Sequence, residues 1–233
     1  MCGRFAFYSP TEATAALFGV ENALPVESRY NIAPTQFIAA IRRDAENLPE
    51  LGSFRWGLVP SWAKDPSIGS RMINARAETI AEKPSFRTAY RKRRCLILAD
   101  GFYEWHTEAG VKIPWFISAA NGEPFAFAGL WEHWQSKETD ESLQTATIVT
   151  TAANQFLSQL HNRMPVILEP EGGRRWLDGD MQLLDDAHTN SPKLRAWPVE
   201  RKVNNARNES PDLIAASGDS ISQTSQGHTS PAH

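Results

Sequence analysis

Apolar residues gather in short segments rich in β-branched and aromatic side chains, separated by polar turns. Segments of this length and composition are typical of strands. The pattern predicts strands over residues 37–42, 54–58, 94–99, 115–118, 125–130 and 147–151. The turn sequence Asn121-Gly122-Glu123-Pro124 further predicts a hairpin between the segments 115–118 and 125–130.

Helical signals are short and scattered. Residues 10–18 follow Ser9, a residue type that caps helices, and begin with proline, which suits the first helical position. Residues 84–91 begin in a similar way, residues 170–177 carry acids early and arginines late, and residues 154–160 lead into His161. Short strands and short helices without βαβ alternation predict an α+β fold with a largely antiparallel, twisted β core.

The composition predicts one domain followed by a tail. The 233 residues suit one large domain, whereas the last segment is rich in Ser, Gln, Thr, Gly and His and poor in large apolar residues. Such a segment buries too little surface to offset its ordering entropy. We therefore predict a single domain over residues 1–207 and a disordered tail over residues 208–233.

The sequence argues against several classes of protein, among them membrane, secreted, disulfide-rich and metal-binding proteins. No apolar run approaches the ~20 residues of a membrane helix, and no secretory signal is visible, so we expect a cytoplasmic protein. Two cysteines cannot form a disulfide framework or a four-cysteine zinc site. No Gly-rich phosphate loop or metal-ligand spacing is present, so we expect no cofactor and no metal. By default we expect a monomer.

Charge gives little sign of a nucleic-acid partner. The net charge is −3, and without the three acids of the segment 208–233 the acidic and basic residues are equal in number. Any contact with a polyanion must therefore come from a local patch. The basic residues between Arg87 and Arg94 are one candidate, although a solvated helix end is the favoured interpretation of that run.

The sequence begins Met1-Cys2-Gly3, and removal of Met1 would leave Cys2 with a free α-amine beside its thiol. Near neutral pH both groups have some nucleophilic form. The pair can close a thiazolidine ring on an aldehyde, or the amine can act as the base for its own thiol, as in N-terminal-nucleophile hydrolases. Cys95 lies in the apolar segment 94–99 and is expected to be an inert, buried thiol.

Other candidates stand in polar segments framed by apolar residues. Glu104, between Tyr103 and Trp105, suits proton transfer if the aromatic neighbours desolvate it, and His161 can shuttle protons near neutral pH. Asn74 and Asn31 could orient an amine or a phosphate. Each of these residues could instead have an ordinary structural role.

Arginine and tryptophan suggest a nucleic-acid contact. Arg4, Arg76 and Arg163 each lie within two residues of a candidate catalytic group, and a guanidinium suits phosphate. Trp62, in a loop with turn residues, could stack on a base.

Together these segments resemble the SRAP (SOS response-associated peptidase) family, over residues 1 to about 207. The shared motifs are Met1-Cys2-Gly3-Arg4-Phe5, Arg29-Tyr30-Asn31-Ile32-Ala33-Pro34, Trp56-Gly57-Leu58-Val59-Pro60-Ser61-Trp62, Ile73-Asn74-Ala75-Arg76-Ala77-Glu78-Thr79, Asp100-Gly101-Phe102-Tyr103-Glu104-Trp105 and His161-Asn162-Arg163-Met164-Pro165.

The resemblance implies a protein of the DNA-damage response that recognises abasic sites in single-stranded DNA and crosslinks to them. Cys2 would form a thiazolidine with the ring-opened sugar, and Glu104 would transfer protons in Met1 removal and in the crosslinking steps. His161 would assist opening of the deoxyribose, and Asn74 would position the Cys2 amine and the sugar.

The resemblance also implies the DNA contacts and the setting. Arg4, Arg76 and Arg163 would contact phosphates, with Asn31 and Trp62 lining the DNA path. Ala63 stands where some bacterial members have a second tryptophan, so a two-tryptophan wedge is not expected. The protein would act in the cytoplasm, on the nucleoid when bound to DNA.

Other functions stay open at this point. A class II glutamine amidotransferase, or another N-terminal-nucleophile hydrolase, would also begin Met-Cys-Gly, and a non-catalytic DNA-binding module would leave Cys2 incidental. A peptidase acting on other proteins is a further alternative, although Met1–Cys2 is the one peptide bond we expect to be cleaved. A Schiff base at an abasic site would also make strand scission (lyase activity) possible.

Overall fold

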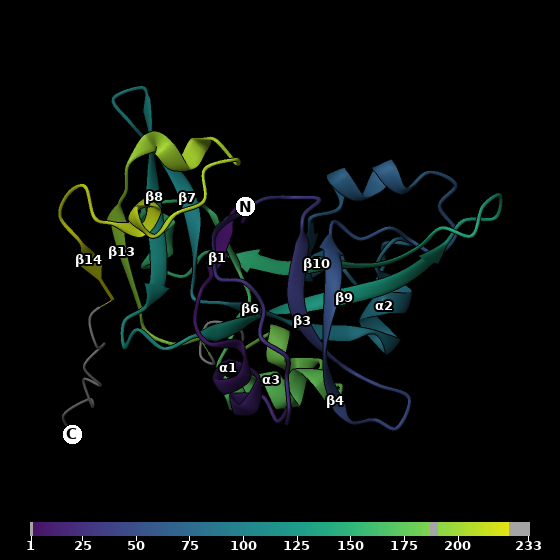
Figure 1. The fold of residues 1–233 in the computed structure, drawn as a ribbon. Coiled ribbons are helices and arrows are strands. Elements are labelled where there is room, and N and C mark those ends of the chain that lie inside the picture. Colours follow the sequence, from purple (N-terminus) through teal and green to yellow (C-terminus); the bar gives the residue numbers. More distant parts are fainter. Residues whose placement is uncertain (1, 187–190, 224–233) are drawn as a thin grey trace, which may run out of the picture.

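Most of the regular secondary structure lies in two β-sheets, with short helices at their edges (Figure 1). The structure is a computed structural model that describes residues 2–186 and 191–223. Strand pairing is antiparallel except where β10 meets β4 and β5. The predicted α+β fold with a largely antiparallel core is therefore confirmed.

The first sheet runs in the spatial order β14 (Ile221–Ser222), β13 (Leu194–Pro198), β8 (Val111–Ala119), β7 (Gly101–Glu108), β1 (Phe5–Phe7) and β2 (Arg29–Ile32). The second runs β11 (Arg163–Pro165), β10 (Ser142–Ala152), β4 (Pro49–Trp56), β3 (Phe37–Arg43), β6 (Arg94–Ala99), β9 (Phe125–Gln135) and β12 (Ile167–Leu168), with β5 (Asn74–Arg76) beside β10. In addition β9 pairs with β10, so strands β3, β4, β10, β9 and β6 close into a ring.

The main core fills the space inside this ring and between the two sheets. Every residue of β6 is buried, as its continuous apolar sequence predicts for a strand covered on both faces. The Phe5 ring of β1 packs edge-on against Trp56, at 5.2 Å between centroids, and against Phe127, at 5.7 Å. These contacts fix the start of the chain against the second sheet.

Three α-helices are present in the described residues, α1 (Thr11–Leu17), α2 (Arg87–Lys92) and α3 (Pro170–Leu177), together with short 3-10 segments. The structure confirms the helix predicted over 170–177. The predicted cap of α1 is wrong, because the Ser9 hydroxyl donates to Asp100 and no side chain caps the helix. The 3-10 segments are Pro66–Arg71, Ala77–Thr79, Leu157–Gln159, Gln182–Leu184, Arg201–Asn204 and Pro211–Ile214.

The hairpin predicted across Asn121-Gly122-Glu123-Pro124 is wrong. β8 pairs with β7 and β13 in the first sheet, whereas β9 pairs with β6, β10 and β12 in the second. The turn therefore carries the chain from one sheet to the other.

The domain also extends beyond the predicted boundary at residue 207. Leu213 is buried, β14 pairs with β13, and the Glu209 carboxylate forms an ion pair with Arg29 at 2.8 Å. Residues 208–223 are thus folded onto the first sheet, contrary to the predicted tail. Residues 224–233 of that predicted tail lie outside the described residues.

The basic run between Arg87 and Arg94 forms α2 and the residues that follow it, in line with the favoured interpretation as a helix end. Arg93 donates to the Glu132 carboxylate at 2.6 Å. The guanidinium carbon of Arg94 lies 5.3 Å from the ring centroids of both Tyr90 and Trp176. Two of the cations are therefore engaged with the protein itself.

Candidate functional site

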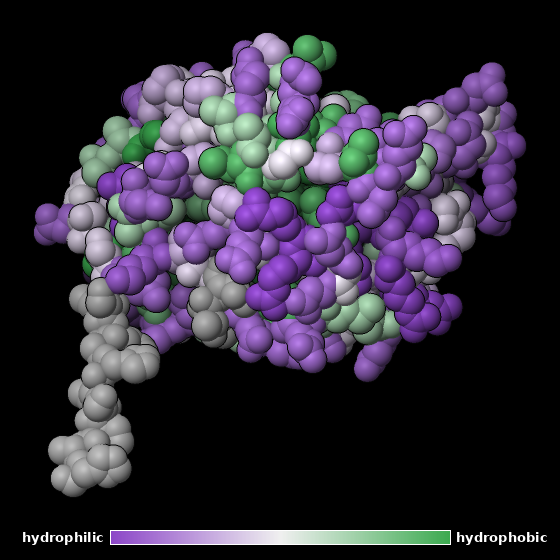
Figure 2. All heavy atoms as spheres, turned by 90° about the horizontal axis from the view of Figure 1, so that it is seen from below, coloured by the Kyte–Doolittle hydropathy of each residue, from purple (hydrophilic) through white to green (hydrophobic). Residues whose placement is uncertain are grey.

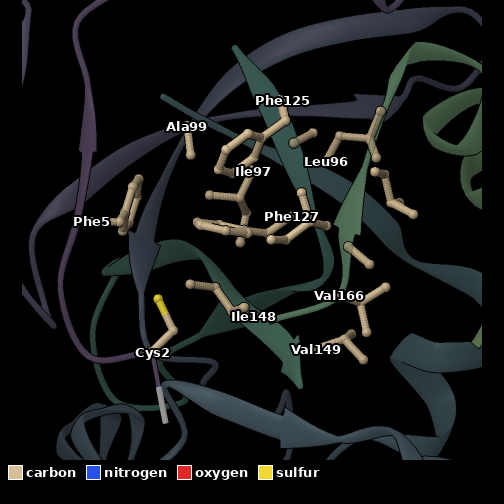
Figure 3. Packing of buried hydrophobic residues seen from close by; sticks show 14 of the residues in the cluster. Cys2, Phe5, Leu96, Ile97, Ala99, Phe125, Phe127, Ile148, Val149 and Val166 are labelled. Atoms are coloured by element: carbon tan, nitrogen blue, oxygen red, sulfur yellow. The ribbon is translucent and has the colours of Figure 1, made fainter. Parts of the chain in front are cut away.

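Cys2 lies in the main core, just before β1 and between the two sheets. Its side chain is fully buried and lies near Phe5 and Ile148 (Figure 3). The thiol donates weakly to the Arg4 carbonyl, at 3.9 Å. Burial, and then the charge of nearby Glu104, raise the pKa of the Cys2 thiol well above its ordinary value. The thiol is therefore protonated at neutral pH.

Asn74 is the residue that holds Cys2 from the second sheet. It begins β5, which runs parallel to β10 with Asn74 opposite Ile148. Its Nδ2 donates to the Cys2 carbonyl at 2.9 Å. Its Oδ1 is buried and has no hydrogen-bond partner among the described residues. An acceptor is thus available beside the Cys2 backbone.

Glu104 approaches Cys2 from the first sheet. Phe5 lies opposite Phe102 in the β1–β7 pairing, which brings the start of the chain alongside the following residues of β7. The Glu104 side chain is only 5% exposed. Its sequence neighbours do not form its environment, because Tyr103 and Trp105 alternate to the other face of β7 and pack in a separate cluster. Burial, rather than those two rings, desolvates the carboxylate.

His161 stands between the 3-10 segment Leu157–Gln159 and β11. Its Nδ1 lies 2.9 Å from the Arg163 backbone nitrogen and 3.3 Å from the Arg163 carbonyl oxygen, so the Arg163 backbone engages this side of the ring. The neighbouring Leu160 carbonyl lies 3.4 Å from Nδ1 of His106. His106 shares a face of β7 with Glu104, two residues away. This contact connects the His161 segment to the strand that carries Glu104.

Arg4 and Asn31 form a buried clamp. Arg4 Nη1 donates to Asn31 Oδ1 at 2.7 Å and to the Val203 carbonyl at 2.8 Å. Asn31 is fully buried, and its Nδ2 donates to the carbonyls of Asn205 and Asn208, at 3.0 and 2.9 Å. This arrangement leaves Asn31 no surface for a direct DNA contact, so the expected role in lining the DNA path is corrected to one of anchoring.

The remaining predicted DNA contacts differ in their availability. Arg163 forms a bidentate ion pair with Glu78, with Nη2–Oε2 at 3.0 Å, and its Nη2 also donates to the Thr150 carbonyl at 2.8 Å. Arg76 is exposed, and the Trp62 side chain is 57% exposed. Arg76 and Trp62 can therefore reach a ligand without breaking an ion pair, whereas Arg163 cannot.

The sequence reasoning missed two neighbours of Glu104. Trp115 lies directly opposite Glu104 in the β7–β8 pairing, and its buried indole N–H has no hydrogen-bond partner among the described residues. His106 follows Glu104 on the same face. The two-residue period of a strand could have identified His106, but the strand pairing that places Trp115 was not visible in the sequence.

Comparisons with known proteins identify the family. The family model described as SOS response associated peptidase (SRAP) matches residues 1–206. The chain belongs to this family. It is similar to the abasic site processing protein YoqW of Bacillus subtilis, with 43% identity over 224 residues that cover 92% of this chain and 99% of the relative. It is also similar to YedK of Escherichia coli, with 31% identity and the same coverage, and YedK too is named an abasic site processing protein.

A solved structure supports the fold. A protein from Bacteroides thetaiotaomicron superposes with a TM-score of 0.78 at 25% identity, covering 92% of this chain and 99% of that one. Within residues 2–186 and 191–223, no helix is long and apolar enough to cross a membrane, and no cluster of His, Cys, Asp and Glu could hold a metal ion.

Proposed function

We propose that this protein recognises abasic sites in single-stranded DNA and becomes covalently linked to them through Cys2. The observation that carries the proposal is the position of Cys2, between the Asn74 carboxamide and the Glu104 carboxylate. The relatives named abasic site processing proteins support it, because the aligned regions include nearly the whole of this chain.

The chemistry begins after Met1 is removed, when the α-amine of Cys2 is free. The amine attacks the C1′ aldehyde of the ring-opened deoxyribose, and loss of one water gives an imine. The Cys2 sulfur then adds to the imine carbon, which closes a thiazolidine ring, while the thiol proton leaves and the ring nitrogen gains a proton. No oxidant or cofactor is needed.

Glu104 is the proposed proton-transfer group in these steps. Because its thiol is protonated at neutral pH, Cys2 needs a base at the moment the sulfur attacks, and the nearest charged acceptor acting on it is Glu104. Once it has accepted a proton from the attacking amine, Glu104 can return that proton to the departing hydroxyl of the first adduct, which leaves as water. The free Oδ1 of Asn74 can accept from the Cys2 amine and hold it toward the aldehyde.

The DNA contacts are proposed to be phosphate contacts and stacking, without base readout. Arg76 is exposed and can bind a phosphate, and Trp62 can stack on a base beside the abasic site. Arg4, held by Asn31, sets the position of the chain start, and Arg163 with Glu78 supports the His161 segment. We propose that His161 assists sugar ring opening through Nε2.

Two further activities belong to the same proposal. Cleavage of the Met1–Cys2 bond would be the peptidase activity to which the family name refers. Strand scission from the imine would compete with ring closure, and fast attack by the adjacent thiol suppresses it. We expect a monomer that acts in the cytoplasm.

A denaturing gel tests the proposal. Met1-processed protein is mixed with a single-stranded oligonucleotide that carries one abasic site, beside the same strand with every base intact. We expect a shifted band for the wild type and for Cys95→Ala, none for Cys2→Ala, and much slower formation for Glu104→Gln. If the wild type gives no shift, the crosslinking proposal is wrong, and release of ammonia from glutamine becomes the next assay.

A further inference from the structure

A second feature, away from Cys2, is a hollow of about 700 Å³. Its walls come from β1, β2, β3, β4 and the segment 20–27 between α1 and β2, which contains no helix or strand. None of the residues assigned above to crosslinking or DNA contact lines it. Figure 2 views the underside of the molecule, where α1 and the turn between β3 and β4 lie, and shows hydrophobic side chains gathered among hydrophilic ones.

Exposed apolar side chains concentrate at this hollow. Among the described residues, four of the eight exposed large hydrophobic side chains line it. They are Leu24 at 79% exposure, Phe37 at 59%, Leu48 at 56% and Val26 at 44%. Single exposed apolar residues are ordinary, but a contiguous group around a concave surface is typical of a binding site.

The charge of the hollow is acidic. Glu21, Glu27, Asp44 and Glu50 line it, and its one basic lining residue is Arg29. Glu50 is paired with Arg42 at 3.0 Å, which leaves three acids without an ion pair among the described residues. Arg29 is already engaged, because it donates to Glu209 at 2.8 Å and to Gln36 at 2.9 Å. A ligand therefore meets apolar surface with net negative charge around it.

This charge selects the kind of occupant. A DNA strand or an anionic membrane would be repelled, since each carries closely spaced negative charges. A segment with apolar side chains between Lys and Arg residues would complement both the surface and its charge. We propose that the hollow binds a basic, amphipathic peptide segment of a partner protein, and so brings that partner to the site of the crosslink.

The test uses a synthetic peptide with leucines and a phenylalanine flanked by lysines, labelled with fluorescein. Fluorescence anisotropy measures its Kd for the full chain, and amide chemical shifts locate the bound peptide. Leu24→Ser and Leu48→Ser are each expected to raise the Kd about tenfold, because each removes one buried leucine from the complex. Val111→Ser is the matched control, because Val111 is exposed elsewhere, and it should leave the Kd unchanged.

The charge is tested separately from the apolar contact. Glu21→Lys with Glu27→Lys should weaken binding of the lysine peptide, and a peptide with glutamates in place of the lysines should not bind. The proposal is overturned if both peptides bind alike, if the shifts fall outside the hollow, or if Leu24→Ser and Val111→Ser bind equally. If the wild type is a dimer and Leu24→Ser converts it to a monomer, the hollow binds a second copy of this chain and the peptide proposal is overturned. Crosslinking to abasic DNA should be the same in all these variants. A failure of the crosslinking proposal can therefore be told apart from a failure of the peptide-binding proposal.

Discussion

Asn31→Ala is predicted to act on stability and leave DNA binding nearly intact. The substitution removes four hydrogen bonds of a fully buried side chain: one from Arg4 at 2.7 Å and those to the carbonyls of Val203, Asn205 and Asn208 at 3.4, 3.0 and 2.9 Å. Arg4 keeps its bond to the Val203 carbonyl. At about 1 kcal/mol for each bond, and less for the long bond to Val203, the free energy of unfolding should fall by about 3–4 kcal/mol.

The assay is urea unfolding followed by tryptophan fluorescence. With a slope of about 2–3 kcal/mol per molar urea, a loss of this size lowers the midpoint by about 1 M or more. Asn162→Ala is the matched control, because Asn162 is exposed and its side chain makes no hydrogen bond among the described residues. Below the unfolding transition, the affinity for single-stranded DNA should change less than about threefold. An unchanged midpoint together with a large loss of DNA affinity would refute the anchoring role.

The remaining predictions concern the thiols and the DNA surface. Burial raises the pKa of the Cys2 and Cys95 thiols, so their stabilising effect is complete below pH ~8.5 and is lost as the pH rises toward the folded-state values. The free energy of unfolding should therefore fall by about 1.4 kcal/mol per thiol for each pH unit above that point, and Cys95→Ala should halve this slope in denaturant titrations between pH 8.5 and 9.5. Trp62→Ala should weaken single-strand binding by about 1–3 kcal/mol in anisotropy titrations and leave the unfolding midpoint unchanged; a shifted midpoint would point to a structural role. Arg76→Ala should reduce the slope of log K against log salt by about 0.7, whereas Arg91→Ala, on α2, should not; equal effects would place the phosphate contacts elsewhere.

Elements with local signals were predicted well. The strand at 94–99 and the helix at 170–177 appear with the expected bounds, because an unbroken apolar run and a proline at the first helical position are local features. The hairpin between β7 and β8 was missed, since its two-residue turn is Ala109-Gly110, both with positive φ. That geometry usually uses Asn-Gly or Asp-Gly, so the turn has no clear sequence signal.

In the candidate site, too, the sequence identified residues by type and motif but not the contacts between distant segments. Cys2, Asn74 and Glu104 were proposed from their residue types and the family motifs; a hydrogen bond joins Asn74 to Cys2, and the charge of Glu104 contributes to the raised pKa of the Cys2 thiol. The burial of Asn31 and the ion pair between Arg163 and Glu78 depend on segments far apart in the chain, so residue type alone suggested the wrong role or gave no partner. Segment 208–223 was judged by composition, although buried Leu213, the ion pair between Glu209 and Arg29 and the pairing of β14 with β13 attach it to the first sheet.

The most direct test of the proposed chemistry counts free thiols in the purified crosslink. The chain has two cysteines, and a thiazolidine consumes the Cys2 thiol, whereas a simple imine has the same mass and leaves the thiol free. The adduct is unfolded in urea, treated with iodoacetamide and measured by intact mass. One alkylated cysteine, located by peptide mapping at Cys95, is the predicted result. Two alkylated cysteines in a stable adduct would contradict the thiazolidine mechanism.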